Sequence, residues 1–108
     1  MDINDVCAYG FKDYFVDRYP GEPIRPVDPD QVEACRAFIR DHCREDKRGH
    51  TSYQFKHIVE GFYNRYIQNG AFIVAAILEG KRLERIRLRG PNAQVFIEVT
   101  TKKRGGRP

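Results

Sequence analysis

The sequence predicts a single α+β domain, with a three-helix core followed by a C-terminal antiparallel β-hairpin, in a winged-helix-like arrangement. Apolar residues recur at three-to-four-residue intervals through residues 29–80, and they alternate with polar residues through 82–100. A chain of 108 residues is long enough for one core but too short for two. Residues 1–28 form an acidic arm with spaced prolines, and residues 101–108 are expected to be a disordered basic tail.

The N-terminal arm is predicted to contain one short helix and one extended segment. Helix-like spacing of apolar residues favours a helix over residues 11–18, which Gly10 keeps from extending further. A proline then stands at every third position of residues 20–29, which is the period of a polyproline II ribbon. A PxxP run of this kind can dock on SH3-type grooves, although a stiff connector on the domain surface is the simpler interpretation.

The first long helix is predicted to begin after Asp28, which can cap it. Pro29 then takes the first helical position and Asp30 lies in the first turn. The helix should end by Asp46, and residues 47–49 are predicted to form an exposed basic loop. One stripe of side chains faces inward. Its members are Val32, Cys35, Phe38, Ile39 and His42.

A second helix is predicted to follow a capping box, in which Thr51 and Gln54 satisfy each other's backbone amides. Asn69 and Gly70 should end this helix, because both tolerate the left-handed conformation of a C-cap. The apolar stripe consists of Phe55, Ile58, Val59, Phe62 and Tyr66. The polar side chains away from this stripe are Lys56, His57, Glu60, Asn64 and Gln68.

Residues 71–78 are apolar on all sides and are followed by Glu79 and Gly80. They are predicted to form a short buried helix, with a buried strand as the alternative. As the central element of the core, this segment would pack against both longer helices.

Apolar and basic side chains alternate from residue 84 to residue 89, which predicts the first strand of the hairpin. Ile86 and Leu88 should point to one side of this strand and three arginines to the other. Residues 90–93 turn the chain, and the second strand continues the apolar face. The arginines are Arg85, Arg87 and Arg89, and the apolar residues of the second strand are Val95, Ile97 and Val99.

Charge is distributed unevenly along the chain, with net −5 over residues 1–46, +2 over 47–80 and +7 over 81–108. A basic C-terminal quarter attracts polyanions. Same-face arginines on a strand lie about 6.6 Å apart, close to twice the axial charge spacing of about 3.4 Å on one DNA strand. Phe96 is expected to be exposed for stacking. The candidate binding residues are Arg85, Arg87, Arg89, Phe96, Lys102, Lys103, Arg104, Lys56, His57 and Asn64.

The first functional hypothesis is a nucleic-acid-binding or regulatory protein that contacts phosphates, above all those of DNA, through the arginine ribbon and the tail. In a helix-turn-helix protein the helix after the turn shows polar side chains to the bases, but residues 71–78 have none. Specificity would then come from the second helix or from the ribbon, and otherwise binding is largely non-specific. The simpler interpretation is that the acidic N-terminal half partly neutralises the arginines, which serve solubility.

One pattern of residues in the middle of the chain is distinctive. It consists of Ser52, Tyr53, Lys56, His57, Glu60, Tyr66, the segments 69–73 and 91–93, Ala75 and Ala76. Over about residues 50–98 this pattern resembles short uncharacterised proteins of phages, prophages and their bacterial hosts. The resemblance implies no particular activity. It implies a mobile-element context, in which small proteins often regulate transcription or block host defence.

This context gives the second hypothesis, a phage-encoded inhibitor or adaptor of a host protein complex, including an anti-CRISPR-type antagonist. Such a protein would act by protein–protein binding without catalysis, and its arginines would contact an acidic surface of the host protein. Tyrosine is favoured at interfaces, although half-buried tyrosines at the edge of a core are the simpler interpretation. The candidate anchors are Tyr9, Tyr14, Tyr19, Tyr53 and Tyr63.

Catalysis is the weakest of the three classes. Lys56, His57 and Glu60 lie on one helical turn and could transfer protons, with Lys56 and Glu60 also forming an i, i+4 ion pair. No nucleophile elbow, phosphate loop or metal signature accompanies them. We therefore expect neither an enzyme nor a cofactor.

The three cysteines are an odd number without a CxxC pair, which argues against a disulfide framework and for a reducing compartment, the bacterial cytoplasm. A zinc site would need two close pairs of ligands, and only His42 and Cys43 are neighbours, so we expect no metal. No apolar run reaches the length of a membrane span. The exposed edge of the hairpin makes a homodimer as plausible as a monomer.

Overall fold

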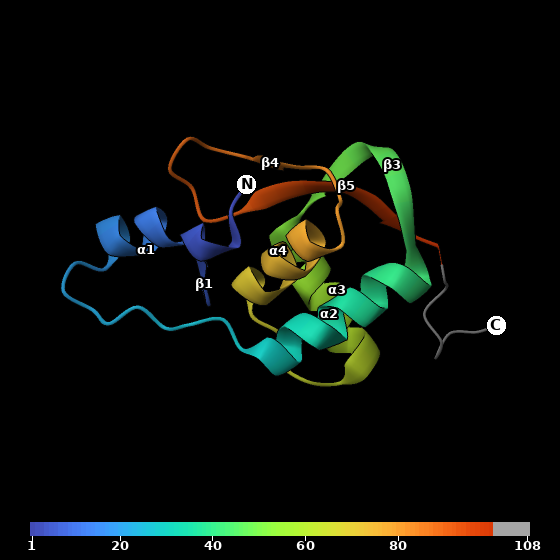
Figure 1. Ribbon diagram of the computed structural model, residues 1–108, viewed down its shortest axis with the longest axis horizontal. Coiled ribbons are helices and arrows are strands. Elements are labelled where there is room, and N and C mark those ends of the chain that lie inside the picture. The colour runs from blue at the N-terminus through green and yellow to red at the C-terminus, as the bar shows by residue number, and fades with distance from the viewer. Residues whose placement is uncertain (101–108) are drawn as a thin grey trace.

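Helices and two antiparallel sheets make up residues 1–100, the part of the chain that the computed structural model describes (Figure 1). The elements are the 3₁₀ turn η1 (Ile3–Asp5), β1 (Val6–Cys7), β2 (Gly10–Phe11), α1 (Lys12–Arg18), α2 (Pro29–His42), β3 (Cys43–Thr51), α3 (Ser52–Tyr63), α4 (Asn69–Leu78), β4 (Leu83–Arg85) and β5 (Ala93–Val99). The predicted α+β class is confirmed, and α1 is the short helix expected in the arm.

The larger sheet has three antiparallel strands in the order β3-β5-β4. β4 pairs with residues 93–95 of β5, so the predicted hairpin is present. β3 pairs along the other edge of β5, with Cys43 opposite Val99 and an irregularity between Glu45 and His50. The prediction of a loop at residues 47–49 is therefore wrong. The expected order of three helices followed by a hairpin is also wrong, because β3 lies between the first two long helices.

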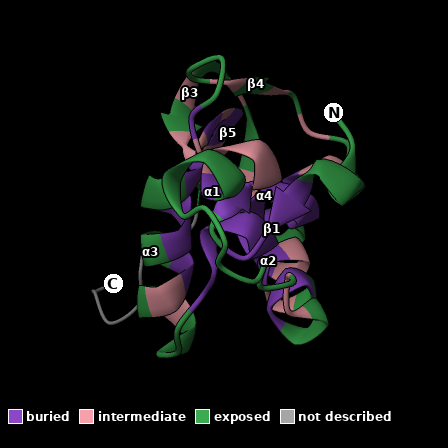
Figure 2. Ribbon diagram, turned by 90° about the vertical axis from the view of Figure 1, so that its left-hand side faces the viewer, coloured by how far each residue is buried: buried purple, intermediate pink, exposed green. Residues whose placement is uncertain are grey.

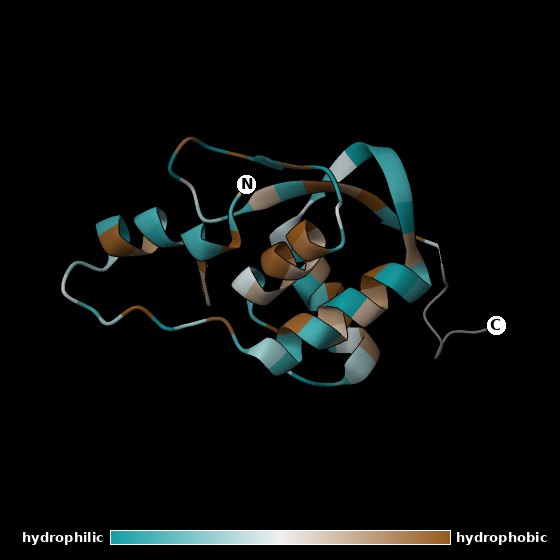
Figure 3. Ribbon diagram, in the orientation of Figure 1, coloured by the Kyte–Doolittle hydropathy of each residue, from teal (hydrophilic) through white to brown (hydrophobic). Residues whose placement is uncertain are grey.

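The core forms where α4 packs against α2 and α3, and the apolar side chains of β5 complete it by packing against α3. α4 is buried along most of its length, as Figure 2 shows, and Figure 3 shows that α4 is mostly hydrophobic whereas β3 is mostly hydrophilic. The ring of Phe72 on α4 stacks on the ring of Phe55 on α3, with centroids 5.0 Å apart. The buried helix predicted for residues 71–78 is therefore confirmed.

The predicted starts of the two long helices are also confirmed. The Asp28 side chain accepts a hydrogen bond from the Asp30 backbone N–H at 2.8 Å, and α2 begins at Pro29. Thr51 and Gln54 form both hydrogen bonds of the capping box at the start of α3. These bonds depend on residues close in sequence, which is why the sequence alone predicts them.

The predicted end of the second helix is wrong. α3 ends at Tyr63, and Asn64 adopts the left-handed conformation with φ 56° and ψ 47°. Asn69 and Gly70 instead begin α4, where the Gly70 N–H donates to the carbonyl of Ala8 at 3.0 Å. Asparagine and glycine can both end a helix. The second long helix has its C-cap at Asn64, which precedes Asn69 and Gly70 in the chain.

The predicted long first strand of the hairpin is wrong as well. β4 ends at Arg85, and residues 86–92 form a loop. Leu88, expected to face the core, is 91% exposed, and Ile86 is also exposed. The alternating pattern continues in the sequence beyond the point at which β5 can offer a pairing partner, because β5 begins at Ala93.

No helix among the described residues has both the length and the apolar character needed to cross a lipid bilayer. The most apolar one, α4, has ten residues.

Candidate functional site

The three arginines of the predicted ribbon do not form one row facing solvent. Arg85 donates two hydrogen bonds to the carboxylate of Asp13 on α1, one of them 3.1 Å long. Arg89 donates to the carboxylate of Asp17 at 2.7 Å, also on α1. Arg87 is exposed and has no ion pair within residues 1–100. The expectation that these guanidinium groups are free of carboxylate partners is therefore wrong for two of the three.

These ion pairs shift the pKa values of two of their members. Hydrogen bonds from Arg85 lower the pKa of Asp13 below its ordinary value, and the Asp17 carboxylate raises the pKa of Arg89. The Asp13 carboxylate is thus charged near neutral pH, and the ion pairs with α1 offset the charge of two of the three ribbon arginines.

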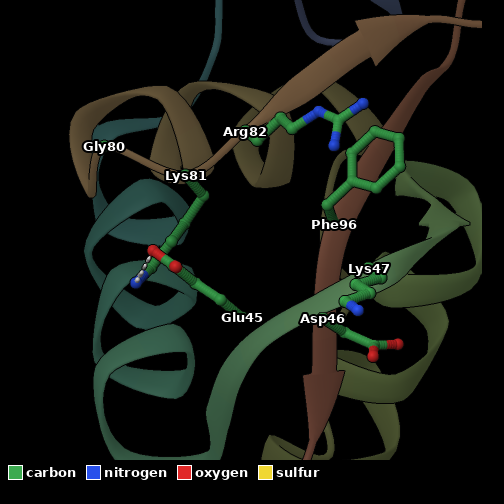
Figure 4. Close-up of a pocket in the computed structure, with 7 residues that line it drawn as sticks. All are labelled: Glu45, Asp46, Lys47, Gly80, Lys81, Arg82 and Phe96. Atoms are coloured by element: carbon green, nitrogen blue, oxygen red, sulfur yellow. Dashed lines mark ion pairs between the residues drawn. The ribbon is translucent and has the colours of Figure 1, made fainter.

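Phe96 was expected to be an exposed stacking platform, and this is wrong, because only 9% of it is exposed. The guanidinium carbon of Arg82 lies 3.9 Å from the centroid of its ring. Phe96 and Arg82 line a cavity of about 460 Å³ in which Lys81 points toward Glu45 (Figure 4). The remaining lining residues are Asp46, Lys47 and Gly80. Charges of both signs line this cavity, so it does not favour an anion over a cation.

A second cavity, of about 400 Å³, is lined by five of the six tyrosines of the chain. We call it the tyrosine cavity. Its tyrosines are Tyr9, Tyr14, Tyr19, Tyr53 and Tyr66, and its other lining residues are Ala8, Lys56, Asn69, Pro91 and Asn92. Tyr66 and Tyr53 are 63% and 51% exposed, so their rings are accessible to a ligand.

The tyrosine cavity is assembled from segments far apart in sequence: the arm, α3, the start of α4 and the loop before β5. Asn69 joins these segments, because its side-chain N–H donates to the carbonyl of Tyr9 at 3.0 Å and to the side-chain oxygen of Asn92 at 2.9 Å. The Asn69 side-chain oxygen is buried and has no hydrogen-bond partner in residues 1–100. Asn69, a residue of the cavity lining, therefore keeps a buried acceptor with unmet hydrogen-bonding capacity.

Lys56 is the one charged residue that lines the tyrosine cavity, and it is buried. Its ammonium group lies 4.8 Å from the ring centroid of Tyr66 and 5.5 Å from that of Tyr53. Glu60 accepts from Lys56 Nζ at 3.0 Å, which confirms the predicted i, i+4 pair. This lysine is held between two rings and a carboxylate, whereas the sequence placed it on the polar face of its helix.

Glu60 has further partners. It accepts from the Ile67 backbone N–H at 3.0 Å and lies 2.8 Å from His57 Nδ1. Burial by itself raises the pKa of Glu60, but the hydrogen bonds from Ile67, Lys56 and His57 together outweigh burial and lower it. Glu60 therefore stays ionised near neutral pH and ties α3 to the segment before α4.

The structure brings together some of the predicted site residues and separates others. Lys56 lines the tyrosine cavity. His57 is outside the lining, and its ring contacts Glu60, the carboxylate that pairs with Lys56. Asn64 is an exposed helix end outside the cavity lining. The tail residues Lys102, Lys103 and Arg104 lie outside the described part of the chain.

Four of the five tyrosines predicted as anchors, all except Tyr63, line the tyrosine cavity. Tyr66 was missed, because its spacing assigned it to the apolar stripe of the second helix. Its place next to the segment 69–70, within the pattern that resembles phage proteins, was the signal that could have identified it. That same pattern contributes Tyr53, Lys56, Asn69, Pro91 and Asn92 to the cavity.

The described residues are poorly suited to nucleophilic chemistry by a thiol. Burial raises the pKa of both Cys35 and Cys43 to about 12, so these thiols stay protonated. Within residues 1–100, no group of three or more His, Cys, Asp and Glu side chains is arranged to hold a metal ion.

Comparison of the chain with family models, with curated proteins and with solved structures found no match. The geometry of the tyrosine cavity and the distribution of charge therefore carry the functional proposal.

Proposed function

We propose that the protein binds single-stranded nucleic acid and that the tyrosine cavity receives one or more unpaired bases. The observation that carries this proposal is the convergence of five tyrosines with Lys56 and two asparagine side chains on one cavity. Proteins that bind single strands stack bases on aromatic rings, and each stacked base contributes about 1–3 kcal/mol. The cavity supplies such rings at Tyr53 and Tyr66.

The polar groups of the cavity suit the edges of bases. Asparagine amides and lysine can hydrogen-bond to base edges once a base is unstacked from its neighbours. The unpartnered oxygen of Asn69 would accept from the N–H group of a base after a small rotation of the side chain. A duplex keeps its bases stacked, so the proposal favours single strands over duplexes.

The distribution of charge supports a polyanionic ligand through the tail. Residues 1–100 contain fifteen basic and fifteen acidic residues, so the formal net charge of +4 comes from the four basic residues of the tail. We propose that Lys102, Lys103 and Arg104 supply the attraction to phosphates, while the tyrosine cavity holds the bases.

The first prediction concerns Tyr66. Replacing it by alanine is expected to weaken binding of an oligothymidylate about 5- to 150-fold, which is the equivalent of losing one stacked base. The chain contains no tryptophan and five of its six tyrosines line the cavity, so quenching of the tyrosine emission during a titration measures the affinity. A duplex and an RNA strand of matching length complete the comparison.

Tyr63→Ala is the matched control, because Tyr63 is the sixth tyrosine and lies outside the cavity, in contact with Phe38 and Phe62. It should leave the affinity unchanged to within about twofold. Equal losses in the two variants, or no binding of any strand by the unaltered protein, would contradict the proposal.

The second prediction concerns the tail. Replacing Lys102, Lys103 and Arg104 by glutamine is expected to flatten the dependence of log K on log salt by about 2, because each lost contact to a single strand removes about 0.7. The residual affinity should still fall with Tyr66→Ala. An unchanged salt dependence would show that phosphate contacts lie elsewhere.

A protein partner is the second candidate, and the formal neutrality of residues 1–100 favours it. In that case the chain is an inhibitor or adaptor of a host protein complex, and the exposed rings of Tyr53 and Tyr66 are its anchors. Binding of a purified host protein that Tyr66→Ala abolishes, without any nucleic-acid binding, would favour this candidate.

A further inference from the structure

Of the two arginines that pair with α1, Arg85 is also held in place by its own loop. Arg85 donates from Nε and Nη2 to the carbonyl of Gly90, at 2.9 and 2.6 Å. Its guanidinium carbon lies 4.2 Å from the ring centroid of Phe11. Arg85 therefore has a fixed position that does not depend on Asp13 alone. A fixed guanidinium is preorganised for bidentate contact with a carboxylate or a phosphate.

The helix that pairs with these arginines is weakly attached to the rest of the domain. Phe15 is the one buried residue of the seven in α1. Its ring packs beside Tyr9 and Tyr19, at centroid distances of 5.1 and 5.2 Å. The chain enters α1 from the two-residue strand β2 and leaves it through exposed residues 19–26. Figure 1 shows α1 at the periphery of the fold.

The separation of two carboxylates on α1 is on the scale of the separation of charges along a strand of nucleic acid. Asp13 and Asp17 are four residues apart, which corresponds to about 6 Å along a helix. That distance is close to twice the axial charge spacing of about 3.4 Å on one DNA strand. Both carboxylates are partly exposed and accept from Arg85 and Arg89 as phosphate oxygens would.

We propose that Arg85 and Arg89 form a site for the phosphate backbone of nucleic acid, which Asp13 and Asp17 of α1 occupy while the protein is free. This inference rests on the proposed function, since it names a second contact for the same ligand. α1 also carries Tyr14 of the tyrosine cavity and is followed directly by Tyr19, so it lies between the proposed base site and the proposed phosphate site. A strand that reaches both sites exchanges its phosphates for the two carboxylates.

The test removes the two carboxylate charges and keeps the shape of the side chains. Asp13→Asn/Asp17→Asn is titrated with an oligothymidylate at several salt concentrations. We expect tighter binding at low salt and a salt dependence steeper by about 1.4, because two added contacts contribute about 0.7 each. Adding Arg85→Ala and Arg89→Ala to this variant should abolish both gains.

The matched control is Asp30→Asn/Asp41→Asn, which makes the same change in net charge on α2. Neither residue has an ion pair in the described part of the chain. Asp17→Asn alone removes the nearer of the two carboxylates that contact Arg89, because Asp13 remains 3.7 Å from its Nη1, so it should fold normally and steepen the salt dependence by less than about 0.7.

Equal salt dependence in Asp13→Asn/Asp17→Asn and in the control would overturn the inference. The proposed function would survive that result if Tyr66→Ala still weakens binding. A gain in the double variant with no effect of Tyr66→Ala would instead support the phosphate site and contradict the proposed base site. Absence of binding by every variant would contradict both.

Discussion

Replacing Gly70 by alanine is expected to lower the free energy of unfolding by about 3 kcal/mol, at the upper end of the cost of overpacking. A Cβ at this position would overlap the carbonyl oxygen of Cys7 and lie 2.8 Å from its carbonyl carbon. The clash is with backbone atoms, which cannot rotate away as a side chain can. The Gly70 N–H also donates to the neighbouring carbonyl of Ala8, so moving the two segments apart would break this hydrogen bond. Urea unfolding followed by far-ultraviolet circular dichroism measures the loss.

Gly21→Ala is the control for this prediction. Gly21 has a positive φ of 84°, and a Cβ there would meet no atom within 4 Å. Its replacement should cost about 1 kcal/mol through backbone strain alone. If both variants lost equal stability, the close approach of α4 to β1 would not be the reason that position 70 needs glycine. Because Ala8 and Tyr9 follow Cys7, Gly70→Ala should also weaken binding at the tyrosine cavity.

The parts of the fold that the sequence predicts correctly are those determined by neighbouring residues. The caps at Asp28 and Thr51 use partners two and three residues away. The all-round apolar character of α4 determines its burial whatever surrounds it. The β4–β5 pairing follows from a turn and two short runs with alternating apolar residues.

Strand β3 could not be predicted, because its conformation comes from pairing with β5. Most of its residues are charged, one is glycine, and most of its side chains are exposed. A strand with few inward-facing apolar residues lacks the alternation of apolar and polar residues from which a strand is predicted. Its position next to β5 depends on the path of the whole chain.

The candidate site was predicted in its residue types and missed in its geometry. Four of the cavity tyrosines are among the candidate anchors, but their convergence requires the arm to pack on α4, and no local pattern encodes that contact. The ion pairs of Arg85 and Arg89 join residues 72 positions apart. Charge asymmetry indicated that the acidic and basic parts could attract each other, but only the fold shows that two of the three ribbon arginines are paired with the arm.

The substitution Glu60→Gln is expected to lower the free energy of unfolding by about 2–3 kcal/mol. It leaves the buried ammonium group of Lys56 without its carboxylate and weakens the hydrogen bond from the Ile67 N–H. Removing one member of a buried pair costs about 3–5 kcal/mol, and the partial exposure of Glu60 reduces that figure. Glu84→Gln, in an exposed pair with Arg82, should cost less than about 1 kcal/mol.

The dependence of this effect on pH has a definite sign. The pKa of Glu60 is lowered in the folded protein, so its stabilising contribution is present above its ordinary pKa of 4.5. The contribution is lost as the pH falls through the lowered value. The difference in stability between the unaltered protein and Glu60→Gln should therefore be constant near neutral pH and shrink below about pH 4.5.

Lys56→Met in the Glu60→Gln background separates the two causes of the loss. If the unpaired ammonium group is responsible, the double variant should recover most of the lost stability, because no charge is left buried without a partner. An oligothymidylate titration of the recovered variant would also show whether the charge of Lys56 matters for binding, since Tyr53 and Tyr66 would remain in place around an uncharged side chain. No recovery would place the loss in the hydrogen bond to Ile67, and the unpaired ammonium group of Lys56 would not be its cause.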